Sequence, residues 1–231
     1  GDVLDLAAAL GVDLASAAEF TGGVIRGFGL KTHETARVVD VLAQASSNSG
    51  LDFSKMSESL KNVAPTAKLL DVSLERTTAL LGVLSNSMLD GSMGGTGLSK
   101  AFIMLHQKGL TLEEGFERVR NSSDPLKTSL DLVGVIAGKT FSTLATSGDA
   151  LDILEGKLNN AEGAAKKMAE IKLDNLAGDT TKLASAWEGL VLNLEDGQGL
   201  LNKMARGAVK LLISAISGLQ KTSFRLGTSW D

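Results

Sequence analysis

Apolar residues recur at three- and four-residue steps through most of this chain, which is the period of amphipathic helices. The pattern is clearest in residues 73–105, where Ser73 is placed to cap one helix and Thr96 to cap another. The apolar face of this pair comprises Leu74, Thr77, Leu80, Leu81, Leu84 and Met88, then Leu98, Ala101, Phe102 and Leu105. We therefore predict a helical hairpin at the centre of the fold.

A glycine-dense segment separates these two predicted helices and is expected to stop the first, because glycine adopts the left-handed conformation without a Cβ clash. The residues of this predicted structural corner are Gly91, Ser92, Gly94, Gly95, Thr96 and Leu98. A phosphate-binding loop is the alternative, but no Gly-Lys-Ser/Thr closes the segment, Lys100 lies inside the helix and no strand precedes it. A tight corner between helices is the favoured interpretation.

Helix start signals elsewhere in the first half of the chain predict further short helices. Asp13 is expected to cap the second of two helices within residues 2–28, and Thr32 to cap the next. Residues 52–62 form another helix, and Pro65 suits the first turn of its successor.

Two further signals divide the chain. Thr111 and Glu114 form a capping box, and Asp124 precedes Pro125 as a cap precedes a first helical residue. The polar run that ends at Pro125 is the best linker candidate. We expect a helical domain over residues 1–120, a linker with a short helix over 121–143, and a third part over 144–231.

The third part begins with a heptad-like stripe that indicates close helix packing or a thin coiled coil. Its members are Leu144, Leu151, Leu154, Leu158, Ala161, Ala165 and Met168. Gly178 is expected to end this pattern.

A basic amphipathic segment closes the chain, and such segments pack on partners or lie on anionic membranes. The residues of this predicted partner or membrane face are Lys203, Arg206, Lys210, Leu211, Leu212 and Leu219. The apolar run from Leu211 to Leu219 is too short to span a bilayer, so partner packing is favoured.

Composition supports an all-α fold of several short helices. Ala, Leu and Val dominate the apolar residues, aromatic residues make up 4%, and 26 glycines interrupt the helical patterns. We expect helix to exceed half of the chain and no sheet of three strands to form. Because the chain begins at Gly1 rather than Met, it is expected to be a piece of a longer protein.

The chemistry-bearing residues are too few to predict an enzyme. The net charge of −4 does not favour specific nucleic-acid binding, and the chain has no cysteine for disulfides or thiolate ligands. His33 and His106 are the two histidines, which cannot supply a three-ligand zinc site. No serine elbow or sugar-binding aromatic cleft is visible either, so we expect no active site, metal or cofactor.

The order of several motifs resembles that in phage tail tape measure proteins. These motifs are Phe28-Gly29-Leu30, Val39-Asp40-Val41-Leu42-Ala43, Ser73-Leu74-Glu75 and the corner from Gly91 to Leu98. The likeness is firm over residues 1–105 and fainter over 140–195, where Ala186-Trp187-Glu188-Gly189-Leu190 lies.

The resemblance implies a structural protein of the virion, located inside the phage tail and in the host cytoplasm during assembly. Its implied role is to template tail length, fill the tube lumen and assist genome ejection. Implied partners are the tail tube protein, tail tip or initiator proteins, and further copies of the chain, with three copies as the expected number. The alternative is a membrane-active helical domain that forms a passage for DNA through the host envelope, which liposome leakage by residues 196–231 would reveal.

Two expectations concern assembly. The apolar surface of residues 144–219 exceeds what one thin layer of helices can cover, so we predict self-association there. The glycine corners fold the chain back on itself, so we also predict that this segment is a compact body rather than the ruler.

Overall fold

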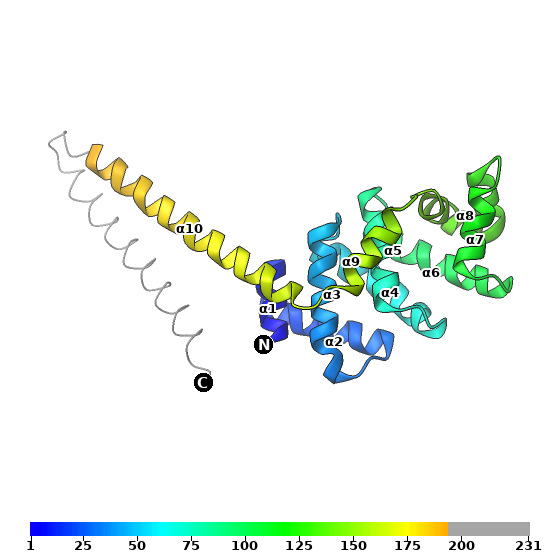
Figure 1. The fold of residues 1–231 in the computed structure, drawn as a ribbon, viewed down its shortest axis with the longest axis horizontal. Coiled ribbons are helices and arrows are strands. Elements are labelled where there is room, and N and C mark those ends of the chain that lie inside the picture. The colour runs from blue at the N-terminus through cyan, green and yellow to red at the C-terminus, as the bar shows by residue number, and fades with distance from the viewer. Residues whose placement is uncertain (194–231) are drawn as a thin grey trace. The chain divides into compact units, whose positions relative to one another are not determined.

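The computed structural model describes residues 1–193 of the chain. The predicted partner or membrane face, Lys203 to Leu219, lies outside these described residues. The described elements are α1 (Asp2–Leu10), α2 (Leu14–Phe28), a 3-10 turn η1 (Thr32–Glu34), α3 (Thr35–Asn48), α4 (Phe53–Leu69), α5 (Leu74–Asn86), α6 (Gly91–Gln107), α7 (Leu112–Arg120), α8 (Pro125–Ala145), α9 (Ala150–Asn159) and α10 (Ala164–Asn193). Residues 1–193 contain no strand, and helices cover well over half of the whole chain, so the all-α prediction is confirmed (Figure 1).

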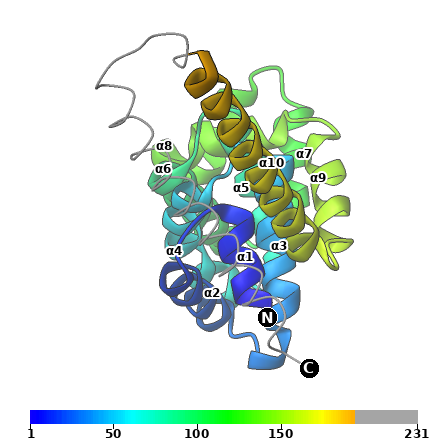
Figure 2. The same cartoon turned by 90° about the vertical axis from the view of Figure 1, so that its left-hand side faces the viewer.

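Residues Gly1–Glu170 form one compact unit, and a second unit begins at Ile171. In the first unit, α1 packs on α2 and α3, and α2 packs on α4 (Figure 2). Helix α8, which lies where a linker with a short helix was expected, consists of two helical parts joined by a kink at Gly134 and packs on α6 and α7.

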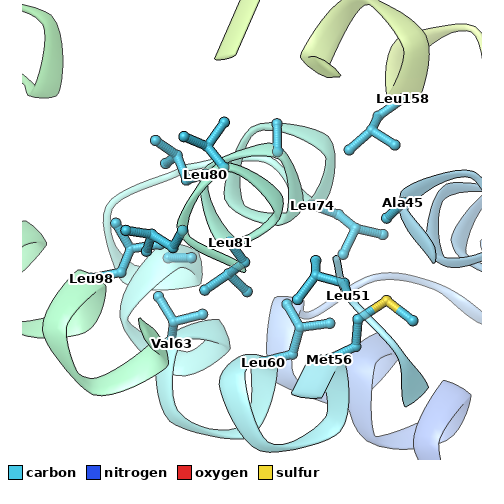
Figure 3. Packing of buried hydrophobic residues seen from close by; sticks show 14 of the residues in the cluster. Ala45, Leu51, Met56, Leu60, Val63, Leu74, Leu80, Leu81, Leu98 and Leu158 are labelled. Atoms are coloured by element: carbon cyan, nitrogen blue, oxygen red, sulfur yellow. The ribbon is translucent and has the colours of Figure 1, made fainter. Parts of the chain in front are cut away.

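Helix α5 lies at the centre of the first unit, packed against α3, α4, α6, α8 and α9. It is buried along nearly its whole length, including its polar residues Glu75, Thr77, Thr78 and Ser85. Figure 3 shows the core that results, in which side chains of α5 meet those of α4, α6 and α9 through Leu80, Leu81, Leu60, Val63, Leu98 and Leu158. The predicted central position of residues 73–105 agrees with this packing.

Local start signals act as predicted at four helices. Asp13, Ser73, Thr111 and Asp124 each accept a hydrogen bond from the backbone N–H three residues later, at 2.8 to 3.2 Å. Glu114 completes the capping box by accepting the N–H of Thr111 at 2.8 Å. These caps satisfy N–H groups that have no partner inside their own helix.

Two start signals that precede the central hairpin mislead. Thr32 caps nothing, because a 3-10 turn over Thr32–Glu34 precedes α3 and the carboxylate of Glu34 accepts the N–H of Lys31 at 2.9 Å. Pro65 starts no helix, because α4 continues through it to Leu69. Proline forgoes a backbone hydrogen bond there, and burial of Val63 and Ala67 on either side of it offsets that loss.

The heptad-like stripe is a core face shared by three helices rather than one continuous coiled coil. All seven of its members are buried or packed against the core. The chain turns between them at Gly148 and Gly163, whose φ angles of 61° and 76° favour glycine. Gly178 does not end the pattern as predicted, because α10 runs on to Asn193.

The capping carboxylates give a pH-dependent contribution to stability. The pKa of Asp13 is lowered by hydrogen bonds from the Ser16 hydroxyl and N–H, and that of Glu114 by those from the Thr111 N–H and hydroxyl. A lowered folded-state pKa means that the contribution is present above the unfolded pKa and lost as the pH falls through the folded one. We expect Asp13→Asn/Glu114→Gln to destabilise the protein at neutral pH, and the deficit to disappear as the pH falls below the unfolded pKa values of the two carboxyl groups and then through their lower folded values.

Urea unfolding of both proteins across this pH range measures the effect. Glu117→Gln, later in α7, is the control and should show no such pH-dependent difference. A deficit that stays constant down to the lowest pH would contradict the assignment.

Candidate functional site

The glycine-dense segment lies inside α6 rather than at a corner before it. The chain turns earlier, at Ser87–Asp90, where Met88 has a φ of 58°, and Asp90 is the N-cap residue. Thr96 is exposed and occupies the second turn of α6, so its predicted role as a cap is wrong. The intrinsic cost of glycine in a helix is outweighed here by the packing that the glycines allow.

The glycines bring the backbone of α6 close to its neighbours. A Cβ atom on Gly95 would lie 2.3 Å from the carbonyl oxygen of Ser59 and 2.7 Å from its Cα atom. A Cβ on Gly97 would lie 2.4 Å from the Thr140 hydroxyl of α8. A Cβ on Gly94 would lie 2.4 Å from the carbonyl oxygen of Leu89. No side chain fits at these distances, so glycine is required where α6 meets α4 and α8.

Polar contacts follow the same line of contact between α4 and α6, which we call the α4–α6 seam. They are Lys55–Asp90 at 2.8 Å, Ser59 Oγ to the Gly91 carbonyl at 2.8 Å, Asn62–Ser92 at 3.3 Å and Thr66–Ser99 at 2.7 Å. The four α4 residues recur at steps of four, three and four, which places them on one face of the helix. The hydrogen bond to Asp90 raises the pKa of Lys55. The seam therefore joins the two helices through close backbone packing and through matched polar pairs.

Arg37 of α3 pairs with Glu75, which is the most buried carboxylate among the ion pairs of the described residues. Its guanidinium donates to both carboxylate oxygens of Glu75 at 2.7 and 2.8 Å, and to Glu34 at 2.8 Å. Glu75, in the first turn of α5, is only 6% exposed. The hydrogen bonds that Arg37 donates to Glu75 raise the pKa of Arg37. This pair ties α3 to the central helix.

Arg76, the next residue in α5, is shared by three carboxylates from two other helices. It contacts Glu113 of α7 at 2.7 Å, Glu155 of α9 at hydrogen-bonding distance, and Asp152 of α9 at 3.8 Å. The ion pairs of the adjacent residues Glu75 and Arg76 thus connect α5 to α3, α7 and α9.

Asp40 of α3 caps the beginning of α10. One carboxylate oxygen accepts the N–H of Gly163 at 2.8 Å, and the other accepts the N–H of Ala165 at 3.0 Å. A carboxylate at a helix N-terminus satisfies free N–H groups and interacts favourably with the helix dipole. The start of α10 is therefore fixed to α3 by a residue 123 positions earlier in the chain.

Removing this cap should loosen the first turn of α10 specifically. We expect Asp40→Ala to cost about 1 kcal/mol locally, as loss of an N-cap does, and to speed amide exchange at Gly163 and Ala165 roughly fivefold. Hydrogen exchange followed by NMR measures this, with Glu170→Gln, an exposed α10 carboxylate, as the control. Equal exchange rates in the Asp40→Ala variant and the parent protein would show that the cap contributes nothing.

The described residues show no sign of metal chemistry or of a spanning helix. No group of three or more His, Asp or Glu side chains in the described part could hold a metal ion. No helix within residues 1–193 is long and apolar enough to cross a membrane.

The predicted corner residues therefore do come together, but as a helix-packing site. Gly91, Gly94, Gly95 and Leu98 are buried, whereas Ser92 and Thr96 are exposed. Sequence reasoning missed Asp40, Arg37 and Ser59, whose partners lie 32 to 125 residues away. The serine and threonine spacing on α4 was the one signal that could have indicated the seam.

Most of this chain is similar in sequence to known phage proteins. The family described as "Phage-related minor tail protein" matches residues 1–224. The chain belongs to this family. The "Tape measure protein" of Pneumococcus phage Dp-1 is 30% identical over 218 residues, covering 82% of this chain and 19% of that protein.

The "Probable tape measure protein" of Escherichia phage P2 is 28% identical over 232 aligned positions, covering 86% of this chain and 28% of that protein. The chain thus spans between about a fifth and somewhat more than a quarter of the length of these relatives. No solved structure matches it. The resemblance to tape measure proteins that the sequence motifs indicated is confirmed, and with it a structural role in the phage tail.

Proposed function

We propose that this minor tail protein chain is the folded body of a tape measure protein. The parent protein templates tail length during assembly, fills the tube lumen and assists genome ejection. The proposal rests on two relatives that carry the name tape measure protein and on the family match over nearly the whole chain. Its partners in this role are the tail tube protein and the tail tip or initiator proteins, and its site is the interior of the tail.

Within that protein, this compact unit lies at one end of the chain and does not set the length of the tail. The observation that carries this proposal is the compact packing of residues Gly1–Glu170, in which α5 is surrounded by five other helices. Drawn out as a single helix, 170 residues would span roughly 255 Å, whereas α4 and α6, with 17 residues each, span only about 26 Å. A compact body adds little length, and it offers a shaped surface for docking on a tail tip or initiator.

A variant that unfolds the body without changing chain length tests this role. We expect phage carrying Gly95→Leu in the parent gene to assemble few tails, or tails that fail to eject DNA, with tail length unchanged. Electron microscopy of lysates gives both tail number and tail length. Normal numbers of functional tails would argue against a docking role.

A pair of deletions distinguishes a docking role of this chain from a role in setting tail length. Deleting residues 73–105 should stop assembly or ejection, whereas deleting 33 residues from a continuous helical region elsewhere in the parent should shorten tails by about 50 Å. Viable phage lacking residues 73–105 with tails shorter by that amount would show that this stretch is part of the ruler.

A further inference from the structure

A groove in the first unit combines apolar side chains with a surplus of negative charge. It lies where the ends of α4 and α6 meet the start of α7 and the side of α9, and its volume is about 940 Å³. We call it the acidic groove and define it by Leu69, Val72 and Leu112 together with Asp71, Glu113 and Asp152.

The apolar part of the acidic groove is open to solvent. Leu69, the last residue of α4, is 82% exposed, and Val72 and Leu112 are only partly buried. Phe102 and Leu105 of α6 lie beneath them and are buried. Leucine side chains at the mouth of a groove would lose contact with water if an apolar helix face covered them.

The charged part of the acidic groove is not neutralised by the chain itself. Arg76 is the single guanidinium facing Glu113, Asp152 and Glu155, and Asp71 adds a fourth carboxylate to the groove lining. Glu113 and Asp152 are 63% and 80% exposed in their side chains. The surplus of carboxylates favours a partner that brings cationic side chains beside apolar ones.

Residues 200–221 of this chain have that chemistry. They include Lys203, Arg206 and Lys210 at steps of three and four, which is the spacing of residues that share one face of an amphipathic helix, and they contain no Asp or Glu. Leu211 and Leu212 follow directly. The match of charge and apolar character is the reason to name this segment as the occupant of the groove.

We propose that the acidic groove binds residues 200–221 of a second copy of the chain. A second copy is favoured because α10, which leads toward that segment, leaves Ile171, Leu173 and Leu176 more than half exposed. An adjoining copy would cover these side chains and contribute its basic segment at once. The groove of one copy and the segment of the next form a heterologous contact, which closes into a ring when the rotation between copies allows it.

Zero-length cross-linking of the full chain tests this contact directly. An equal mixture of ordinary and ¹⁵N-labelled chains is treated with a carbodiimide, which joins carboxylates to amines in contact, and the linked peptides are identified by mass spectrometry. We expect links from Lys203 or Lys210 to Glu113, Asp152 or Asp71, in peptide pairs that combine both isotopes. Links confined to pairs of one isotope, or no links at these carboxylates, would overturn the proposal.

Reversing the charges of the basic segment and then of the acidic groove tests whether their contact drives self-association. We expect Lys203→Glu/Arg206→Glu/Lys210→Glu to weaken self-association at least tenfold by analytical ultracentrifugation, and Glu113→Lys/Asp152→Lys added to that variant to restore it. The matched control adds Glu117→Lys/Asp131→Lys, the same charge change outside the groove, and should restore nothing. Equal rescue by both pairs, or no weakening in the first variant, would overturn the proposal. Circular dichroism verifies folding, and the isotope experiment on the unaltered chain decides the matter if a groove variant does not fold.

Discussion

Replacing Gly95 with alanine is expected to lower the free energy of unfolding by about 3 kcal/mol. The added Cβ would sit 2.3 Å from the carbonyl oxygen of Ser59 and 2.7 Å from its Cα atom, and neither backbone atom can turn aside as a flexible side chain does. Either α6 moves away from α4 or the helix distorts. Both changes disturb the α4–α6 seam, including the buried hydrogen bond from Ser59 to Gly91.

This cost exceeds the gain in helix propensity, which favours alanine over glycine by about 1 kcal/mol. Gly156 and Gly23 are the matched controls, because they lie within helices and an added Cβ meets nothing within 4 Å. We expect Gly156→Ala and Gly23→Ala to stabilise the protein by up to about 1 kcal/mol each. Urea denaturation of the three variants measures the contrast. If Gly95→Ala raises the free energy of unfolding as the control substitutions do, α4 and α6 are not packed as closely as described.

Replacing Arg37 with alanine is expected to destabilise the protein by about 2 kcal/mol, a value between those for exposed and for fully buried pairs. The reason is the carboxylate left behind, since Glu75 is 6% exposed and both its oxygens accept from Arg37. The expected loss of stability is smaller than for a fully buried pair because the side chain of Arg37 is itself 46% exposed.

A double-mutant cycle with Glu75→Gln isolates the interaction, and we expect a coupling energy of at least about 1 kcal/mol. Arg120→Ala, at the end of α7, is the control and should cost less than about 0.5 kcal/mol. A coupling energy near zero would mean that Glu75 is stabilised by its surroundings rather than by Arg37.

The parts of this fold that sequence predicts well are those set by neighbouring residues. Asp13, Ser73, Thr111 and Asp124 each bond to an N–H three positions ahead, so the signal and its partner lie in the same short stretch. The apolar period likewise needs no knowledge of distant residues to indicate a helix.

The features that sequence missed depend on helices that meet from far apart in the chain. A glycine-rich segment ordinarily indicates the end of a helix. The segment from Gly91 to Gly97 is helical because its glycines allow α6 to pack closely against α4 and α8. Pro65 is tolerated inside α4 for a comparable reason, the burial of that helix on both sides of it. The partner of Asp40 could not be chosen from sequence, because a carboxylate on α3 has the same local pattern whether it faces water or the start of α10.

That cap gives the first turn of α10 a particular response to tension. The amides of Gly163 and Ala165 are held by the two oxygens of a single carboxylate, so a pull along the helix loads both hydrogen bonds together. Bonds loaded in parallel share the force and break in one event rather than in sequence. Under such a pull, the start of α10 would therefore separate from α3 in a single mechanical step.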